Sequence, residues 1–317
     1  MILFSISYDV YIIILEVRTM ANKRIKEIMD LIVKNDFVAY THAGTIHPDE
    51  LLSGSLLKCI FKETSFYKLQ NRSLTIRRVT DQYLRDNGIT DENALIFDIN
   101  KGRFDHHQPD CPLRNKDKPK SKYAALGRLW SYVGEEVCLM FGAIDEEAAA
   151  IAARYLDESF IQNMDRTDNF GQQEFPNTLS FLIKCYVSNT NNSDLLDNTY
   201  EELCKMIEFK PIIEFAVKHG NDIQKAKLIA NTTPTDYVIL DQFIPAVNFN
   251  GTHIKYTINE SNRDKGCWNL NSVDSKSYPI SIKQEEIEGC TFIHAAKFLA
   301  VFNSKEAAIK AAEKCLS

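Results

Sequence analysis

The chain has 317 residues, of which 44% are hydrophobic and 25% are charged; this ordinary globular composition excludes disorder, collagen and a disulfide-dense scaffold as the main architecture. At roughly 150 residues per domain, the length suggests about two domains. The 37 Lys and Arg against 43 Asp and Glu give a net charge of −6, so we expect no broadly basic surface that coats long nucleic acid.

An apolar run at residues 10–15 is the first feature of the chain, and it is far too short to span a membrane. It is either an extra strand, a disordered tail, or sequence ahead of a true start at Met20, and none of these predicts a membrane anchor. The eight cysteines include no C-x-x-C pair, which argues against a thiolate zinc site. We expect reduced thiols in a cytoplasmic protein.

The first half of the chain alternates apolar runs with segments of helical periodicity. Strands are expected at residues 37–41, 74–79 and 94–99, and the last of these is apolar on both faces, as buried parallel strands are. Helices are expected at residues 50–61, 124–141, 145–169 and 178–187. This alternation predicts an α/β domain with a mainly parallel sheet.

The second half begins with a polar run at residues 189–194, which is the best linker candidate. Helices should cover residues 195–219 and continue to about 231, and strands should lie at 237–240, 254–258 and 291–294, before a closing helix at 305–314. This pattern predicts a smaller α+β C-terminal domain. The expected division is a tail or mis-assigned start at 1–35, a metal-binding catalytic domain at 36–190, a helical connector at 191–234 and a substrate-binding domain at 235–317.

The first chemical motif, HAGTIHPDE, directly follows the first predicted strand and contains His42, His47 and Asp49. In open α/β sheets, ligands bind at the carboxyl ends of the strands. The alternative is a surface loop whose Asp49 caps the next helix, but capping does not explain two histidines.

A second histidine motif, FDHHQ, contains Asp105, His106 and His107. Consecutive histidines point in different directions, so one can ligate a metal while the other faces a substrate, and the preceding carboxylate can orient an imidazole. A His-His pair alone is a weak signal, but its combination with the first motif is strong.

Three further carboxylates complete the set. Asp98 ends a predicted buried strand, where it can bridge two metal ions or simply form a turn. Asp165 and Asp168 lie three residues apart on one helix face, where two like charges are costly unless a cation compensates them; the alternative is a solvated helix end.

Imidazole and carboxylate ligands without a thiolate favour Mn²⁺, Fe²⁺, Zn²⁺ or Mg²⁺ over a closed structural zinc site. A set of such ligands for two ions that share one aspartate is typical of a two-metal hydrolase.

The order of the motifs, HAGTIHPDE, FDIN, FDHHQ and MDRTDNFG, resembles the DHH phosphoesterase superfamily and, more narrowly, the melanocyte-proliferating-gene (MYG) family. Residues 122–127 resemble that family's S-A-G helix start, and residues 266–270 and 289–295 resemble its terminal W and FVHA-like segments. The likeness runs from about Phe37 to Ser317. The chain departs from the family pattern in the shortened stretch 100–103 and in Arg166-Thr167 and Phe170 of the fourth motif.

The resemblance implies a DHH-type catalytic domain and a metal-dependent hydrolase, with 3′–5′ RNA exonuclease as the better supported activity of the family. It implies two divalent ions, most readily Mn²⁺. The implied ligands of the first ion are His42, His47 and Asp98. Those of the second are Asp49, Asp98, His106 and Asp168.

In the same resemblance, Asp165 is a helper or an alternative ligand, and His107 faces the scissile phosphate with Asp105 as its catalytic partner. The bridging water then attacks phosphorus in line, and the developing charge is stabilised by the ions and His107.

The C-terminal domain is expected to bind the substrate through His294, Lys297 and Arg263, with Trp268 as a possible stacking platform. His294 can equally be a core histidine, and a Trp such as Trp268 is more often a core residue than a platform. The leading hypothesis is a phosphodiesterase acting on single-stranded RNA or short oligonucleotides. The alternatives are a phosphohydrolase for a small nucleotide or pyrophosphate, and a metal-stabilised binding module without turnover. A homodimer is possible.

Overall fold

The computed structural model of the chain describes residues 23–64, 72–109, 111–115, 122–171, 178–187 and 193–317. By its internal contacts the chain divides into two compact units, Met1–Lys218 and His219–Ser317, which we call the first and second unit. The expected domain boundaries near residues 35, 190 and 234 stay a prediction. The apolar run at residues 10–15, the start at Met20 and most of the expected linker lie outside the described residues.

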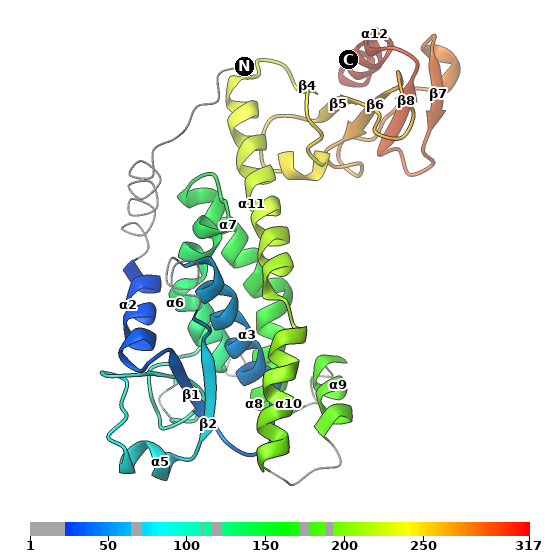
Figure 1. Cartoon of the computed structure of the whole chain (residues 1–317). Helices are drawn as coiled ribbons and strands as arrows, with labels where there is room; N and C mark the ends of the chain where they lie inside the picture. The colour runs from blue at the N-terminus through cyan, green and yellow to red at the C-terminus, as the bar shows by residue number, and fades with distance from the viewer. Residues whose placement is uncertain (1–22, 65–71, 110, 116–121, 172–177, 188–192) are drawn as a thin grey trace, which may run out of the picture. The chain divides into compact units, whose positions relative to one another are not determined.

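The first unit is built around a three-stranded sheet in the order β2-β1-β3 (Figure 1). β1 (Val38–His42) lies in the middle and pairs in parallel with both β2 (Thr75–Val79) and β3 (Leu95–Ile96). The sequence therefore predicted the α/β class and the parallel sheet correctly. In such a sheet the carboxyl ends of the strands share one edge.

The third strand is shorter than predicted, because the backbone turns sharply after Phe97. Asp98, Asn100 and Lys101 all adopt positive φ values of 56°, 66° and 55°, which end the extended conformation. Phe97 then forms an isolated parallel bridge with Phe104. The chain thus folds into a compact turn at the end of the strand.

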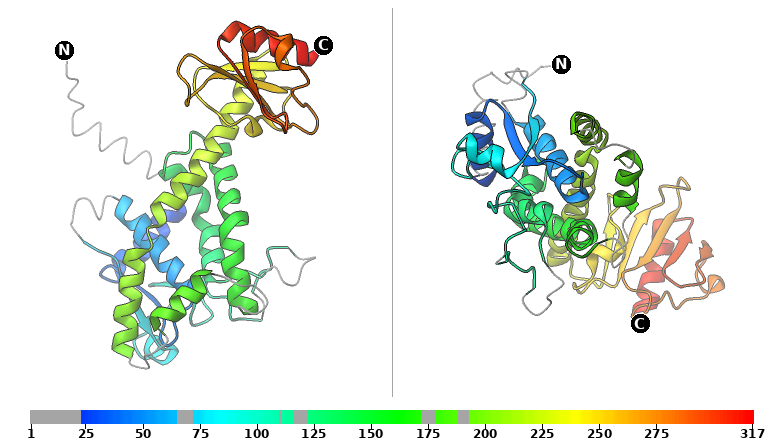
Figure 2. Two further views of the ribbon diagram at one scale, coloured as in Figure 1. Left: turned by 90° about the vertical axis from the view of Figure 1, so that its right-hand side faces the viewer. Right: turned by 90° about the horizontal axis from the view of Figure 1, so that it is seen from below.

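Helices make up most of the rest of the first unit, and the last of them, α11, continues past Lys218 into the second unit (Figure 2). Their bounds are Lys23–Lys34 (α2), Pro48–Glu63 (α3), Asp81–Asp86 (α5), Ala125–Met140 (α6), Glu146–Leu156 (α7), Gln162–Phe170 (α8), Thr178–Val187 (α9), Ser193–Met206 (α10) and Phe209–Thr232 (α11). α3 is buried over most of its length and packs against α6, α8 and α10. It therefore carries the acidic end of the first motif into the interior.

Two helices differ from the sequence-based expectation. Residues 23–34 form α2, whose Ile25, Ile28 and Ile32 are buried at helical spacing, although the expected division placed them in an N-terminal tail or mis-assigned start. The single helix expected over residues 145–169 is interrupted by a π-helical turn at Asp157–Ile161. That turn presents Asp157 to Arg114.

The second unit contains a five-stranded mixed sheet in the order β4-β5-β6-β8-β7. The strands are Tyr237–Leu240 (β4), Tyr256–Glu260 (β5), Trp268–Ser272 (β6), Cys290–Ile293 (β7) and Leu299–Phe302 (β8). The closing helix α12 (Lys305–Leu316) packs four buried alanines into a core with this sheet. The expected smaller α+β part therefore has a sheet of its own, although the sequence missed β6 and β8.

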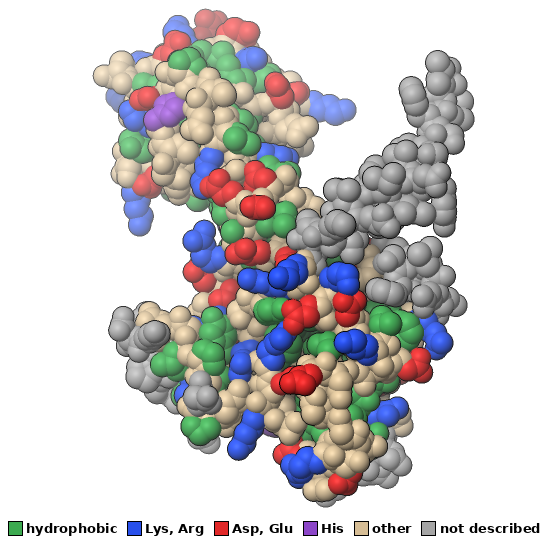
Figure 3. Space-filling view, turned by 90° about the vertical axis from the view of Figure 1, so that its left-hand side faces the viewer, with side chains coloured by type: hydrophobic (Ala, Val, Ile, Leu, Met, Phe, Trp, Pro, Cys, Tyr) green, Lys and Arg blue, Asp and Glu red, His purple; other side chains and the backbone are tan. Residues whose placement is uncertain are grey.

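Charged side chains of both signs and free cysteines occur in the described structure. On the face drawn in Figure 3, basic and acidic side chains are interspersed over the first unit. All eight cysteines are free. Among the described helices, none is both long enough and apolar enough to cross a bilayer.

Candidate metal centre

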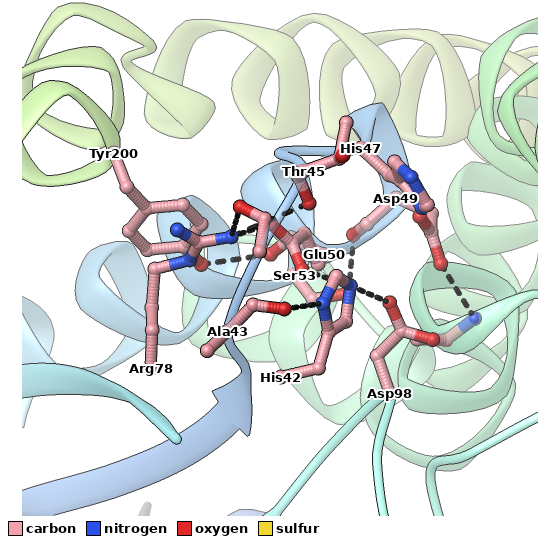
Figure 4. Close-up of polar contacts among 12 residues, drawn as sticks. His42, Ala43, Thr45, His47, Asp49, Glu50, Ser53, Arg78, Asp98 and Tyr200 are labelled. Carbon is pink, nitrogen blue, oxygen red and sulfur yellow. Dashed lines mark hydrogen bonds and ion pairs between the residues drawn. The ribbon is translucent and has the colours of Figure 1, made fainter. Parts of the chain in front are cut away.

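The candidate centre lies where β1, β3 and α3 meet. His42 is the last residue of β1, Asp98 follows β3, and His47 directly precedes α3, whose first turn carries Asp49 and Glu50. Because β1 and β3 are parallel, their carboxyl ends bring His42 and Asp98 to the same edge (Figure 4). The fold thus gathers residues that are more than fifty positions apart.

Asp98 is the centre of the cluster, and its side chain is only 1% exposed. Its Oδ2 lies 3.2 Å from His42 Nε2, and its Oδ1 lies 3.2 Å from His106 Nε2 and 3.6 Å from His107 Nδ1. One carboxylate therefore faces three imidazoles.

A second set of contacts surrounds His106. Its Nε2 lies 3.1 Å from Asp168 Oδ2 and 3.9 Å from Asp49 Oδ2, while His47 Nδ1 lies 3.6 Å from Asp168 Oδ1. The donor atoms of the cluster fall into three groups, each within 4.8 Å: His42, Glu50 and Asp98; Asp98, His106 and His107; and His47, Asp49 and Asp168.

Several of these polar atoms are buried without a hydrogen bond to another described residue. They are both carboxylate oxygens of Asp98, Asp49 Oδ1, Glu50 Oε2 and His106 Nε2. Several of them face one another at ion-pair distance, but burying such atoms without a hydrogen bond is costly. Converging imidazole nitrogens and carboxylate oxygens are the ligands that Mn²⁺, Fe²⁺ and Zn²⁺ take, and the residues therefore fit a divalent metal.

The charges of the cluster are strongly coupled. Burial alone would lower the pKa of His42 and His106. Contacts with Asp98 and Glu50 instead raise the pKa of His42 to about 11, and contacts with Asp168 and Asp98 raise the pKa of His106 to about 11. Burial would raise the pKa of Asp98, yet His106 and His42 lower it to about 2. Burial, together with the charges of Asp168 and Asp98, raises the pKa of Asp49 well above its ordinary value. The acids of this site therefore depend on nearby positive charge.

Glu50 was not among the ligands proposed from the sequence. Its Oε2 contacts His42 Nε2, and its Oε1 lies 3.2 Å from the guanidinium of Arg78. Tyr200 donates its hydroxyl proton to the carbonyl of Glu50 at 3.0 Å. The sequence signal for Glu50 was its place as the second acid of the HPDE run. Its partners Arg78 and Tyr200 come from distant segments, so they gave no indication of its role.

The start of α6 binds two of the predicted acids. The amide of Ala125 donates to Asp49 Oδ2 at 3.2 Å, and the amide of Gly127 donates to Asp165 Oδ1 at 3.1 Å. The first amides of a helix have no partner within it, so they are ready donors to carboxylates. Asp49 Oδ2 thus lies between the start of α6 and His106, while Asp49 Oδ1 has no hydrogen bond to another described residue.

Asp165 lies apart from the three ligand groups. Its carboxylate contacts Arg114, which also binds Asp157. Burial raises the pKa of Asp165 to about 7, although Arg114 opposes this shift. The structure thus places Asp168, and not Asp165, among the clustered donors, and Asp165 beside Arg114.

His107 faces a cavity rather than the interior. Its side chain is 57% exposed, and its backbone amide and its Nδ1 lie 3.0 and 2.7 Å from Asp105 Oδ1. The hydrogen bond to Asp105 raises the pKa of His107. The cavity has a volume of about 620 Å³, and its lining includes His42, His47 and Asp98. The cluster is therefore accessible to a ligand.

The three substrate residues predicted in the C-terminal part all lie in the second unit. His294 follows β7, and its ring lies 4.2 Å from that of Phe298. Lys297 has a positive φ of 56°, and Arg263 is exposed in the turn before β6. Trp268 is half-buried under the ammonium group of Lys305. Their role in substrate binding stays a prediction.

The fold and the site define an α/β protein with a candidate divalent-metal centre at the carboxyl edge of a parallel sheet. The family described as "Uncharacterised protein family (UPF0160)" and labelled MYG1_exonuc matches residues 38–201, just over half of the chain. The chain therefore belongs to this family, which confirms the resemblance to the MYG family. The label of the family suggests a metal-dependent hydrolase.

Curated relatives extend the likeness. A MYG1 protein of Dictyostelium discoideum is 21% identical over 89% of this chain and 97% of its own length. A MYG1 protein of Schizosaccharomyces pombe is 23% identical over 87% and 96%, and one of Caenorhabditis elegans is 27% identical over 41% and 38%. No solved structure matches the chain.

Proposed function

We propose that the chain is a metal-dependent phosphodiesterase that works as a 3′–5′ exonuclease on single-stranded RNA or short oligonucleotides. The observation that carries this proposal is Asp98, a buried carboxylate that lies between three imidazoles and opens on a cavity. The family label, MYG1_exonuc, supports the same reaction class. We further propose a DHH-type layout for the catalytic part, residues 36–190, and membership of the DHH phosphoesterase superfamily.

The proposed ligands of one ion are His42, His47 and Asp98, with Glu50 added by its contact with His42. The proposed ligands of the second are Asp49, Asp98, His106 and Asp168, a set supported by the contacts around His106 Nε2. Bound divalent ions, which we propose to be Mn²⁺, would supply an activated water and neutralise phosphate charge.

The protein's own residues have three tasks in this proposal. His107, which lines the cavity, donates a hydrogen bond to the phosphate oxygen on which charge develops. Asp105 keeps the ring of His107 oriented through the contact at Nδ1. Asp165 is a positioning residue, because it links Arg114 to the start of α6.

Two further proposals concern the rest of the chain. The C-terminal part, residues 235–317, binds the substrate through His294, Lys297 and Arg263. The protein is proposed to work in the cytoplasm, and its eight free cysteines support a reducing compartment.

The test is hydrolysis by the purified, metal-stripped chain resupplied with Mn²⁺, Mg²⁺ or Zn²⁺. Single-stranded RNA labelled at either end should release mononucleotides from its 3′ end, and a chelator should abolish this release. Asp98→Ala should be inactive, while Asp30→Asn, a control on α2, should remain active because Asp30 is exposed and pairs with Lys26 of the same helix. Metal-independent hydrolysis, or no hydrolysis of any phosphodiester, would refute the proposed function.

A further inference from the structure

Two cationic side chains line the cavity beside the cluster. Arg85 comes from α5, the short helix that follows β2, and Lys101 comes from the turn that follows Asp98. Both residues are exposed. The terminal nitrogen of Arg85 donates to the amide oxygen of Gln82 at 3.0 Å. Neither side chain has a carboxylate at ion-pair distance in the described parts of the chain.

Three other arginines of the first unit are already paired. Arg78 binds Glu50, and Arg114 binds Asp165. Arg103, which is two residues from Lys101, binds Glu27 at 2.6 Å. Arg85 and Lys101 are therefore distinguished by their position on the cavity and by their free charge. An anion in the cavity would gain both charges without breaking an existing ion pair.

The backbone fixes Lys101 close to the cluster. Its amide donates to Asp105 Oδ2 at 2.6 Å, and Asp105 Oδ1 receives the amide of His107. The positive φ values of Asp98 and Lys101 are unusual for residues with side chains, and such strain is concentrated at functional sites. The same strained turn thus carries the central carboxylate and the free ammonium group.

From this arrangement we propose that Arg85 and Lys101 form a subsite for a second phosphate group, next to the one that is hydrolysed. The inference rests on the proposed function, in which His107 and the cluster receive the scissile phosphate. A cavity of about 620 Å³ is within the range of roughly 300–1,000 Å³ that small-ligand sites occupy, so it has room beyond a single phosphate. The substrate class is an oligonucleotide that carries a further phosphate one nucleotide beyond the scissile phosphate. Asp81, which also lines the cavity, opposes a more highly charged anion.

The experiment compares two dinucleotides, pApA and ApA, which differ only in the second phosphate. In the wild type, kcat/KM for pApA should exceed that for ApA, and this ratio should fall as salt is added. Arg85→Ala and Lys101→Ala should each lower the ratio about tenfold, as for the loss of one charged hydrogen bond. Arg85→Lys should retain most of the ratio, and Arg85→Gln should not, because charge and not size binds the phosphate.

Arg77→Ala is the matched control, because Arg77 is an exposed residue of the adjoining strand that does not line the cavity. It should keep the wild-type ratio. A ratio that is unchanged in both Arg85→Ala and Lys101→Ala would overturn the subsite while leaving the proposed function intact. ADP serves as a second test ligand. If the Arg85 and Lys101 variants changed the hydrolysis of ADP but not that of the dinucleotides, the oligonucleotide assignment would be overturned.

A binding measurement separates the two proposals. Fluorescence anisotropy in a chelating buffer gives the affinity of a labelled oligonucleotide with and without its 5′ phosphate. If the chain hydrolyses nothing but binds the phosphorylated form more tightly through Arg85 and Lys101, the subsite stands and the proposed function fails. Equal affinities of both forms for the wild type would contradict the subsite.

Discussion

Substitution of Gly127 by alanine tests how the start of α6 supports the metal centre. A Cβ atom at this position would collide with the Asp165 carboxylate and the Arg114 guanidinium. Both groups are held in place, since Asp165 also accepts the amide of Gly127 and Arg114 also binds Asp157. The new methyl group therefore has to displace a buried ion pair.

The magnitude follows from two opposing effects. Alanine in place of glycine stabilises a helix by about 1 kcal/mol. Breaking a buried ion pair costs about 3–5 kcal/mol, so the net loss of unfolding free energy should be about 2–4 kcal/mol. For a unit of this size, 1 kcal/mol shifts Tm by about 2–4 °C, and Gly127→Ala should lower Tm by roughly 10 °C.

The assay is thermal unfolding at pH 8, where Asp165, with a pKa of about 7, is ionised in the wild type. Ser131→Ala is the control, because Ser131 is exposed on the same helix and should tolerate alanine with little change in Tm. In an Asp165→Ala background, Gly127→Ala should lower the free energy of unfolding by less than it does in the wild type. The carboxylate that the new Cβ atom would meet is absent in that background. A Gly127→Ala protein that melts at or above the wild-type temperature would refute the reasoning. So would a double mutant whose loss of unfolding free energy equals the sum of the losses in Gly127→Ala and Asp165→Ala.

Three further predictions concern the metal centre itself. Asp98→Ala should remove both ions and activity, whereas Asp49→Ala should remove only one ion, as measured by elemental analysis. If Asp98→Ala retained two ions, Asp98 would not be the bridging ligand. His106→Ala should weaken metal binding, but His107→Ala should keep the metals while kcat falls about a hundredfold, and the reverse pattern of metal content would exchange the two roles. Chelation should lower the Tm of the wild type, since ligands that bind the folded state stabilise it, and an unchanged Tm would contradict a metal held by this cluster.

The elements that the sequence predicted well are those whose own residues determine them. β1 belongs to a short apolar run, β2 contains the β-branched residues Thr75, Ile76 and Val79, and α12 repeats buried alanines at helical spacing. β6, in contrast, reads WNLNS and gains its stability from its neighbours, for example from Asn271, which donates to Asn259 of β5 at 2.9 Å. Its polar composition gives little local indication of a strand.

The same distinction applies to the site. The motifs contained the histidines and aspartates that the fold gathers, because short loops after parallel strands must reach the same edge. Arg78 and Arg114 were missed because nothing near them in the sequence shows which acid each one meets. Glu50 could be recognised as a partner of His42 only in the folded chain, where the first turn of α3 lies beside the end of β1.

Asp105 connects the two proposals made for this site. Its side chain is 2% exposed, and its two oxygens serve different partners: one receives the amide of Lys101, and the other receives the amide and meets the ring of His107. One buried carboxylate therefore sets both the strained turn that presents Lys101 and the orientation of His107. Any movement of Asp105 would shift the proposed phosphate subsite and the proposed donor together. This shared support explains why an aspartate stands directly before the two histidines although the structure places it outside the three ligand groups.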